Sequence, residues 1–168
     1  RGRRAHAAKW IAGGSGGAIL TSLDGFTWIA RNSGVSNDLY GMAWSGDQSI
    51  AVGSSGTVLT SPDGATWTAQ ASGTPQDLSG IAWSGSQFLA GGSGGGMLAG
   101  PDAINWASQA SGTTEDLYGI AWAGDRWIAV GSNATRIVQT RPWGDLKPLL
   151  INRWTMLRLP AVPGKPLV

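Results

Sequence analysis

The sequence predicts an all-β fold built from four-stranded units in tandem. Two series of tryptophans recur with a period of 39 residues: Trp28, Trp67 and Trp106, and Trp44, Trp83 and Trp122. A fixed period of this size indicates a repeat architecture in which each repeat is one supersecondary unit. The chain also holds 27 Gly and ten Trp against two Phe and two Tyr, which favours short strands and tight turns.

One full unit covers residues 38–76 and contains four strand-like segments. These segments are separated by turns rich in Gly, Ser and Asp, a pattern typical of meander hairpins. The expected strands of this unit are 39–44, 49–53, 57–60 and 65–69. The following units predict strands at 78–83, 87–91, 96–99 and 105–108, and then at 117–122, 126–131 and 136–139.

Four-stranded units in tandem are typical of the blades of a β-propeller. We therefore expect an arc of about four blades, the first and last incomplete, with units at 1–37, 38–76, 77–115 and 116–139. A β-helix or another β-solenoid is the alternative, although its repeat is usually one short rung. Propellers commonly close with four to eight blades. Units this short more often sit in rings of six to eight blades, so the arc is expected to belong to a larger ring, completed by blades outside this sequence or by pairing of chains.

The period fails after residue 139, where Arg141 stands at the position of Asp63, and Asp145 at that of Trp67. Residues 140–168 are basic and contain five prolines, which argue against one long helix. We predict that this segment is a tail outside the repeat, from a shifted reading frame or a foreign junction. At the other end, residues 1–9 match a degraded or cut opening strand.

Charge is divided unevenly along the chain. Residues 10–125 contain nine acids and a single base, Arg31, whereas both ends are basic. The bases are scattered and the repeat body is acidic, so no nucleic-acid partner is expected. Cysteine is absent, which excludes disulfides and thiolate zinc sites. No apolar run of about 18 residues is present, so no membrane span is expected, and no signal peptide is recognisable.

The heptapeptide at residues 61–67, Ser-Pro-Asp-Gly-Ala-Thr-Trp, resembles the Asp-box or BNR repeat of sialidases. Copies stand at 22–28 and, altered, at 100–106. The family pattern is Ser-x-Asp-x-Gly-x-Thr-Trp, so these copies are one residue shorter around the glycine. The whole unit is similar to bacterial repeat proteins grouped with the photosystem II assembly and stability factors. This resemblance implies a propeller fold, an extracytoplasmic location, and a box that serves the fold away from any ligand.

The box residues themselves suit a structural role. Asp and Ser side chains can bond the amides of their own turn, and Gly permits a positive φ. The tryptophan is expected to enter the fourth strand and to bury its ring against the neighbouring sheet. The predicted box residues are Ser22, Asp24, Gly25, Trp28, Ser61, Asp63, Gly64, Trp67, Asp102 and Trp106. The second tryptophan series, Trp44, Trp83 and Trp122, is expected in the core.

A candidate ligand face is indicated by other repeated residues. Asp38, Asp77 and Asp116 each precede a leucine at a blade entry, where they could ring a channel and bind cations or sugar hydroxyls. The alternative is a capped turn before the first strand. Tyr40 and Tyr118 recur, with Ser79 between them, and are candidates for stacking on sugars.

An enzymatic function is not expected. Sialidase-like chemistry needs an arginine triad, a Tyr–Glu pair and an acid Asp, but residues 10–125 contain one arginine, and Glu115 is the chain's one Glu. With His6 as its one histidine, the chain has no His-based triad or metal cluster. We expect a non-catalytic binding or assembly scaffold, without cofactor, for a protein or glycan partner. The alternatives are a carbohydrate-binding module, the non-catalytic part of a sialidase-like glycosidase, or a truncated repeat product without independent function.

Overall fold

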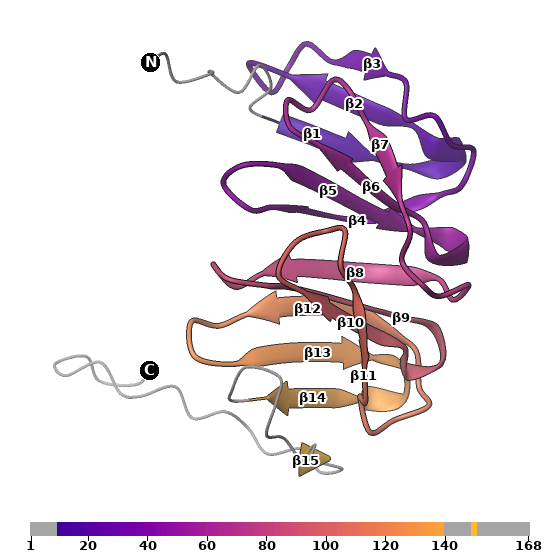
Figure 1. The fold of residues 1–168 in the computed structure, drawn as a ribbon, viewed down its shortest axis with the longest axis vertical. Coiled ribbons are helices and arrows are strands. Elements are labelled where there is room, and N and C mark those ends of the chain that lie inside the picture. Colours follow the sequence, from indigo (N-terminus) through magenta and orange to yellow (C-terminus); the bar gives the residue numbers. More distant parts are fainter. Residues whose placement is uncertain (1–9, 140–148, 151–168) are drawn as a thin grey trace, which may run out of the picture.

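The chain folds into four antiparallel sheets that follow one another in sequence order (Figure 1). The computed structural model describes residues 10–139 and 149–150. Within these residues no α-helix is present, and no helix has the length and apolar character needed to cross a membrane. The predicted opening strand within residues 1–9, and His6 with it, lies outside the described residues.

Each sheet is a meander in which neighbouring strands are consecutive in the chain. Sheet 1 contains β1 (Trp10–Gly13), β2 (Ile19–Ser22) and β3 (Ile29–Arg31). Sheet 2 contains β4 (Leu39–Trp44), β5 (Ser49–Gly53), β6 (Val58–Ser61) and β7 (Thr68–Gln70). Sheet 3 contains β8 (Leu78–Trp83), β9 (Phe88–Gly92), β10 (Met97–Gly100) and β11 (Ala107–Gln109). Sheet 4 contains β12 (Leu117–Trp122), β13 (Trp127–Gly131), β14 (Arg136–Gln139) and β15 (Leu149–Leu150).

A short 3-10 turn joins the second and third strands of each complete meander, and the equivalent strands of sheet 1. These turns are η1 (Ser15–Gly17), η2 (Ser54–Gly56), η3 (Ser93–Gly95) and η4 (Ser132–Ala134). The middle residue of each turn has a left-handed backbone, with φ between 50° and 63°. Sequence analysis expected a turn here but not its 3-10 geometry.

The apolar cores lie between successive sheets rather than within one. The cluster between sheets 1 and 2 contains Ile19, Leu39, Ala51 and Leu59. Between sheets 2 and 3 lie, among others, Ile50, Val52, Leu78, Phe88 and Leu98. Leu89, Met97, Leu117 and Trp127 join sheets 3 and 4. Sheets that pack face to face in sequence order form a partial β-propeller arc, which confirms the fold class predicted from the repeat.

Glycines allow the first strands of neighbouring sheets to approach closely. A Cβ at Gly41 in β4 would lie 3.2 Å from the Ser79 carbonyl oxygen of β8. A Cβ at Gly80 in β8 would lie 2.9 Å from the Tyr118 carbonyl oxygen of β12. The first strands β4, β8 and β12 therefore pack backbone against backbone and form the common inner side of the arc.

The third and fourth strands of sheets 2 and 3 differ from their predicted bounds, whereas β14 has the predicted bounds 136–139. The predicted strand 57–60 is observed as Val58–Ser61, and the predicted strand 65–69 as Thr68–Gln70. Trp67 therefore precedes the fourth strand and does not enter it. The cause is the turn itself, because Asp63 accepts hydrogen bonds from amides as far as Thr66 and holds that segment out of the ladder.

Sheet 4 receives a short fourth strand from the segment that the sequence assigned to the tail. Strand β15 pairs antiparallel with β14, with Leu149 opposite Val138 and Leu150 opposite Ile137. The rest of that segment lies outside the described residues, so its assignment as a non-repeat tail stays a prediction, as do the proposed unit boundaries.

Candidate functional site

Each sheet presents two rims, set by the direction of its strands. The junction rim carries the 3-10 turns and the loops 32–38, 71–77 and 110–116, which lead into the next sheet. The box rim, at the opposite ends of the strands, carries the box turns 22–28, 61–67 and 100–106. The residues predicted for a ligand face lie on the junction rim, and the box residues on the other.

Aspartates of the junction rim link neighbouring sheets. Asp77 Oδ1 accepts a hydrogen bond from the Ser55 amide of the preceding sheet at 2.8 Å, while its carbonyl accepts one from the Ser93 amide of its own sheet at 3.0 Å. Asp38 and Asp116 accept equivalent amide bonds to their carboxylates, from Gly16 at 2.7 Å and Gly94 at 2.8 Å. Each aspartate thus connects the 3-10 turns of two sheets.

The tyrosines occupy irregularities in the first strands. The pairing of β4 with β5 shifts between Leu39 and Gly41, and that of β12 with β13 shifts between Leu117 and Gly119. Tyr40 and Tyr118, the residues inside these shifts, expose 49% and 57% of their surface. A bulge of this kind re-aims a side chain away from the sheet faces. Ser79 holds the same position in β8.

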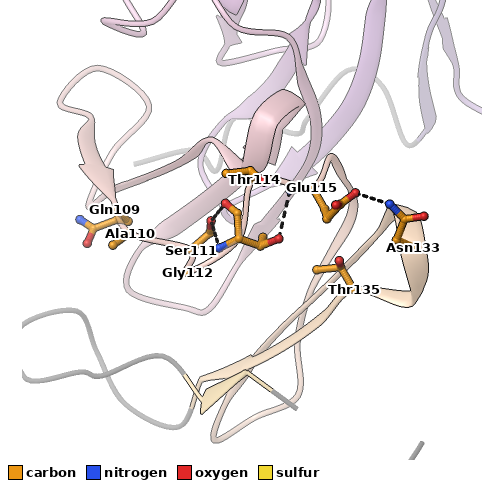
Figure 2. A pocket seen from close by; sticks show the side chains of 10 residues that line it. Gln109, Ala110, Ser111, Gly112, Thr114, Glu115, Asn133 and Thr135 are labelled. Carbon is orange, nitrogen blue, oxygen red and sulfur yellow. Dashed lines mark hydrogen bonds between the residues drawn. The ribbon is translucent and has the colours of Figure 1, made fainter. Parts of the chain in front are cut away.

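A polar hollow of about 710 Å³ lies on the junction rim between sheets 3 and 4. Figure 2 shows Glu115 and Asn133 directed toward one another across one side of it. Glu115 Oε2 accepts hydrogen bonds from Asn133 Nδ2 at 2.6 Å and from Ser132 Oγ at 3.1 Å. At the other junctions the position of Glu115 is held by the neutral Asn37 and Gln76. Only this described junction therefore carries a carboxylate there.

A serine–glycine turn lines the floor of this hollow and recurs at every described junction. Ser111 Oγ donates to the Thr113 carbonyl at 3.1 Å and accepts from the Thr113 amide at 3.3 Å (Figure 2). The equivalent Ser33 and Ser72 are also buried and make the same pair of bonds. Sequence reasoning missed this motif, although Ser-Gly recurs with the same period of 39 residues.

The box turns on the opposite rim are closed by local hydrogen bonds. Asp63 Oδ1 accepts from the amides of Ala65 and Thr66, both at 2.8 Å, and the Ser61 hydroxyl accepts from the Gly64 amide at 2.8 Å. Gly64 has a φ of 74°, in the left-handed region that glycine favours. Ser22, Asp24 and Gly25 repeat this arrangement.

The third box turn keeps the aspartate but loses the serine. Asp102 Oδ1 accepts from the Ile104 and Asn105 amides at 3.0 and 2.7 Å. Gly100 replaces the serine, and a Cβ there would overlap the Asn105 carbonyl oxygen. The backbone of this turn therefore approaches position 100 too closely for a side chain there.

Amide donors lower the pKa of all three box carboxyls. The pKa of Asp24, Asp63 and Asp102 lies below its ordinary value, and the largest cause in each is the backbone amide three residues later. Hydrogen bonds to the charged form favour ionisation. These carboxylates remain ionised in weak acid and keep their turns closed.

The box tryptophans pack between sheets where a preceding sheet is present. Trp67 and Trp106 contact the clusters before their own sheets, and each indole N–H donates to a box carbonyl at 3.1 Å. Trp28, in sheet 1, is 41% exposed.

The surroundings of the second tryptophan series, Trp44, Trp83 and Trp122, differ with the residue that stands opposite each tryptophan on the next strand. Trp83 and Trp122 stand opposite Phe88 and Trp127, with ring centroids 4.3 and 4.9 Å apart. Trp44 stands opposite Ser49 and is 42% exposed.

The residues considered for catalysis do not converge. Arg31 lies in β3 of sheet 1, where its Nε donates to Thr21 Oγ1 at 2.9 Å. Glu115 lies at the junction of sheets 3 and 4. Among residues 10–139 and 149–150, no three His, Cys, Asp or Glu side chains gather as a metal site would require.

Comparison with known proteins places this geometry in a structural class. No family model and no curated protein matches the chain. The structure is similar to that of YCF48 bound to a D1 peptide, with a TM-score of 0.68, 17% identity, and coverage of 86% of this chain and 50% of that one. It is also similar to YCF48 from Cyanidioschyzon merolae, with a TM-score of 0.63, 18% identity, and coverage of 86% and 52%.

At these identities the likeness shows the fold alone, which is a YCF48-like β-propeller arrangement. The chain spans about half the length of the YCF48 structures that it matches.

Proposed function

We propose that this chain is a non-catalytic propeller scaffold that binds an extended protein segment along the junction rim, across β4, β8 and β12. The observation that carries the proposal is the exposure of Tyr40 and Tyr118 at equivalent bulges on the inner side of the arc. Strand positions that face no neighbouring sheet are free to contact a ligand. The YCF48 structure with a bound D1 peptide supports a peptide as the class of partner.

The chemistry of the rim suits a polypeptide with basic and apolar side chains. Tyrosines offer large, rigid contact areas at low cost in conformational entropy, and they are enriched among binding hot spots. Ser79, between the two tyrosines, leaves room for a side chain of the partner. The Glu115 carboxylate and the acidic repeat body favour lysine or arginine in the segment.

The finer family assignment is part of the same proposal. The sequence resemblance to photosystem II assembly factors favours an assembly role in an extracytoplasmic compartment. The local bonds of Asp63 and Asp24 favour the Asp-box interpretation of the box turns, with a structural function. Sialidase chemistry is not proposed, because Arg31 and Glu115 lie in different sheets.

The test uses peptides selected against the intact chain. A D1 peptide and phage-displayed peptides of about 12 residues are labelled, and their Kd values are measured by fluorescence anisotropy. We expect Tyr40→Ala and Tyr118→Ala each to weaken binding by about tenfold, as for a hot-spot aromatic. Glu115→Gln is expected to weaken basic peptides more than neutral ones. Phe26→Ala, which removes an exposed ring on the box rim, serves as the matched control.

If a variant that combines Tyr40→Ala and Tyr118→Ala binds the peptides as tightly as the wild-type chain does, the binding site does not lie on this rim. Binding on a glycan array that is lost in the same tyrosine variants would instead favour the carbohydrate-binding module. Absence of both peptide and glycan binding in a folded sample would favour a truncated product without independent function.

A further inference from the structure

Two positions of the repeat differ in charge from one junction of the arc to the next. We call the junctions of sheets 1 and 2, 2 and 3, and 3 and 4 the first, second and third junctions. One position ends the outer strand of each sheet and is held by Arg31, Gln70 and Gln109. The other lies in the loop that follows and is held by Asn37, Gln76 and Glu115. Together they carry one positive charge at the first junction, none at the second and one negative charge at the third.

The side chain of Arg31 lies on the face of sheet 1 that packs against sheet 2. Arg31 stands opposite Ile19 in the ladder of β2 and β3, and directly opposite residues share one face of a sheet. Ile19 belongs to the apolar cluster between sheets 1 and 2. The hydrogen bond from Arg31 to Thr21 agrees, because Thr21 is two residues from Ile19 on the same strand. Arg31 therefore borders the first junction.

The equivalent position borders the hollow at the third junction (Figure 2). Gln109 stands opposite Met97, which packs in the cluster between sheets 3 and 4, and Gln109 lines the hollow of about 710 Å³. Glu115 lines the same hollow from the loop that follows β11. The two positions of the repeat therefore meet at one junction, one on the outer strand and one on the loop.

The loop position contacts the next 3-10 turn at both ends of the arc. Asn37 Nδ2 donates to the Ser54 carbonyl of η2 at 3.3 Å. Glu115 Oε2 accepts from Ser132 Oγ, and Ser132 is the equivalent residue of η4. The same place on the rim thus holds a neutral amide at the first junction and a carboxylate at the third.

Both charged groups keep atoms that can bind a ligand. Arg31 and Glu115 are half-buried, and half-buried charges are screened less than fully exposed ones. Among the described residues neither has an ion-pair partner, since the ion pair found there joins Asp125 and Arg126. The printed sequence of described contacts uses Nε of Arg31 and Oε2 of Glu115, which leaves the terminal nitrogens of the guanidinium and Oε1 of the carboxylate.

The other carboxylates of the junction rim do not create this difference. Asp38, Asp77 and Asp116 recur at the three junctions, and each accepts a hydrogen bond from an amide of the preceding 3-10 turn. They add the same negative charge to each junction. Arg31 and Glu115 therefore make the first and third junctions electrostatically different.

We propose that the junction rim selects the order of charges in the segment that it binds, an inference that rests on the proposed function. An acidic side chain of the segment pairs with Arg31 at the first junction, where the guanidinium offers a planar fork of donors. A basic side chain pairs with Glu115 at the third. Stacked sheets lie about 10 Å apart, so the two junctions are separated by about 20 Å, which about six residues of extended chain span. The two charges fix which end of the segment lies over sheet 1.

The test compares two synthetic peptides of identical composition on the full chain. Both are built on the tightest peptide of the selection above, with its own charges removed. Each carries one Glu and one Lys about six residues apart, in opposite orders. Fluorescence anisotropy is expected to give Kd values that differ by about tenfold, because the wrong order brings like charges together at both junctions.

Charge variants identify the residues responsible. Arg31→Gln and Glu115→Gln each introduce the residue that the repeat uses elsewhere at that position, and each is expected to reduce the preference to about threefold. The double variant Arg31→Glu/Glu115→Arg is expected to invert the preference. Arg126→Gln removes a charge from the box rim and is expected to leave the preference unchanged. Circular dichroism checks that every variant keeps its β-sheet content.

The outcomes separate this inference from the proposed function. If both peptides bind equally and Tyr118→Ala weakens both, the scaffold function stands and the selection of charge order is wrong. A preference that survives the exchange of charges in the double variant also overturns the selection. If neither peptide binds the folded chain, or if the tyrosine substitution has no effect, the proposed function fails and this inference fails with it.

Discussion

The two rims of the arc use aspartate in different ways. On the box rim, Asp63 bonds amides two and three residues later, so each turn is closed within its own hairpin. On the junction rim, Asp77 bonds the amide of Ser55, 22 residues earlier and in the preceding sheet. Both aspartates recur with the same period, yet one organises a turn and the other joins two sheets. Periodicity alone does not distinguish a local role from an inter-sheet role.

The largest effect is expected where backbone approaches backbone on the junction rim. Gly56→Ala adds a methyl group that overlaps the Thr74 carbonyl oxygen, at a φ of 67°. The clash and the left-handed backbone together are expected to lower the free energy of unfolding by roughly 3 kcal/mol. Urea denaturation measures this loss.

Gly73→Ala is the matched control for that substitution. Gly73 has a similar φ of 76° but open space around it, so its variant is expected to lose only about 1 kcal/mol. Equal losses in the two variants would mean that the close approach at η2 contributes nothing.

A smaller loss of stability is expected when either kind of aspartate is removed, and hydrogen exchange should distinguish the two. Asp77→Ala and Asp63→Ala are each expected to cost about 1 kcal/mol, because each removes solvent-accessible hydrogen bonds to amides. Hydrogen exchange should differ in its location. The Asp77 variant is expected to expose amides of η2 and the start of β8, in two sheets. The Asp63 variant is expected to affect residues 64–67 alone, and a spread into sheet 1 or sheet 3 would contradict the local role.

Low pH is expected to reduce the stability that the carboxylates of the box turns contribute to the fold. The folded-state pKa of Asp24, Asp63 and Asp102 is lowered, so their stabilising contribution is present above the unfolded value of about 4. It is lost as the pH falls through the lower folded-state values. Thermal unfolding between pH 7 and pH 2 is therefore expected to show a falling Tm below about pH 4. In Asp63→Asn this fall should be shallower, and an unchanged slope would exclude Asp63 as a contributor.

The smallest effect concerns the left-handed residue of η2. Ser55 has a φ of 53°, where Gly16 and Gly94 are found in the equivalent turns. Ser55→Gly is expected to stabilise the fold by less than about 1 kcal/mol, because relief of strain is partly offset by a more flexible unfolded chain. A destabilisation measured by urea unfolding would show that the serine side chain contributes to the junction.

Sequence reasoning succeeded where a signal was local and repeated. The first strands, such as Leu39–Trp44, were predicted to the residue. Each of them is bounded on both sides by a glycine-containing turn or loop, which marks its ends in the sequence. The fourth strands of sheets 2 and 3 were misplaced, because the amide bonds of Asp63 and Asp102 extend each turn beyond its motif. Strand β15 falls in residues 149–159, which the sequence left open between a short helix and a strand because periodicity does not decide there.

The candidate site was only partly visible in the sequence. The recurrence of Asp38, Asp77 and Asp116 was evident, but their amide partners in the preceding sheet are set by how sheets pack. Exposure of the tyrosines depends on a pairing shift that the strand pattern does not reveal. Whether these residues bind a ligand stays a prediction.

Gly41 and Gly80 have a consequence for the curvature of the whole assembly. Their missing side chains bring β4, β8 and β12 together on the inner side, while bulkier residues separate the sheets farther out. The space between successive sheets is thus wedge-shaped. It is narrow on the inner side because Gly41 and Gly80 carry a hydrogen atom where other residues carry a Cβ. An alanine at either position would widen that side, flatten the wedge and require more sheets to complete a circle.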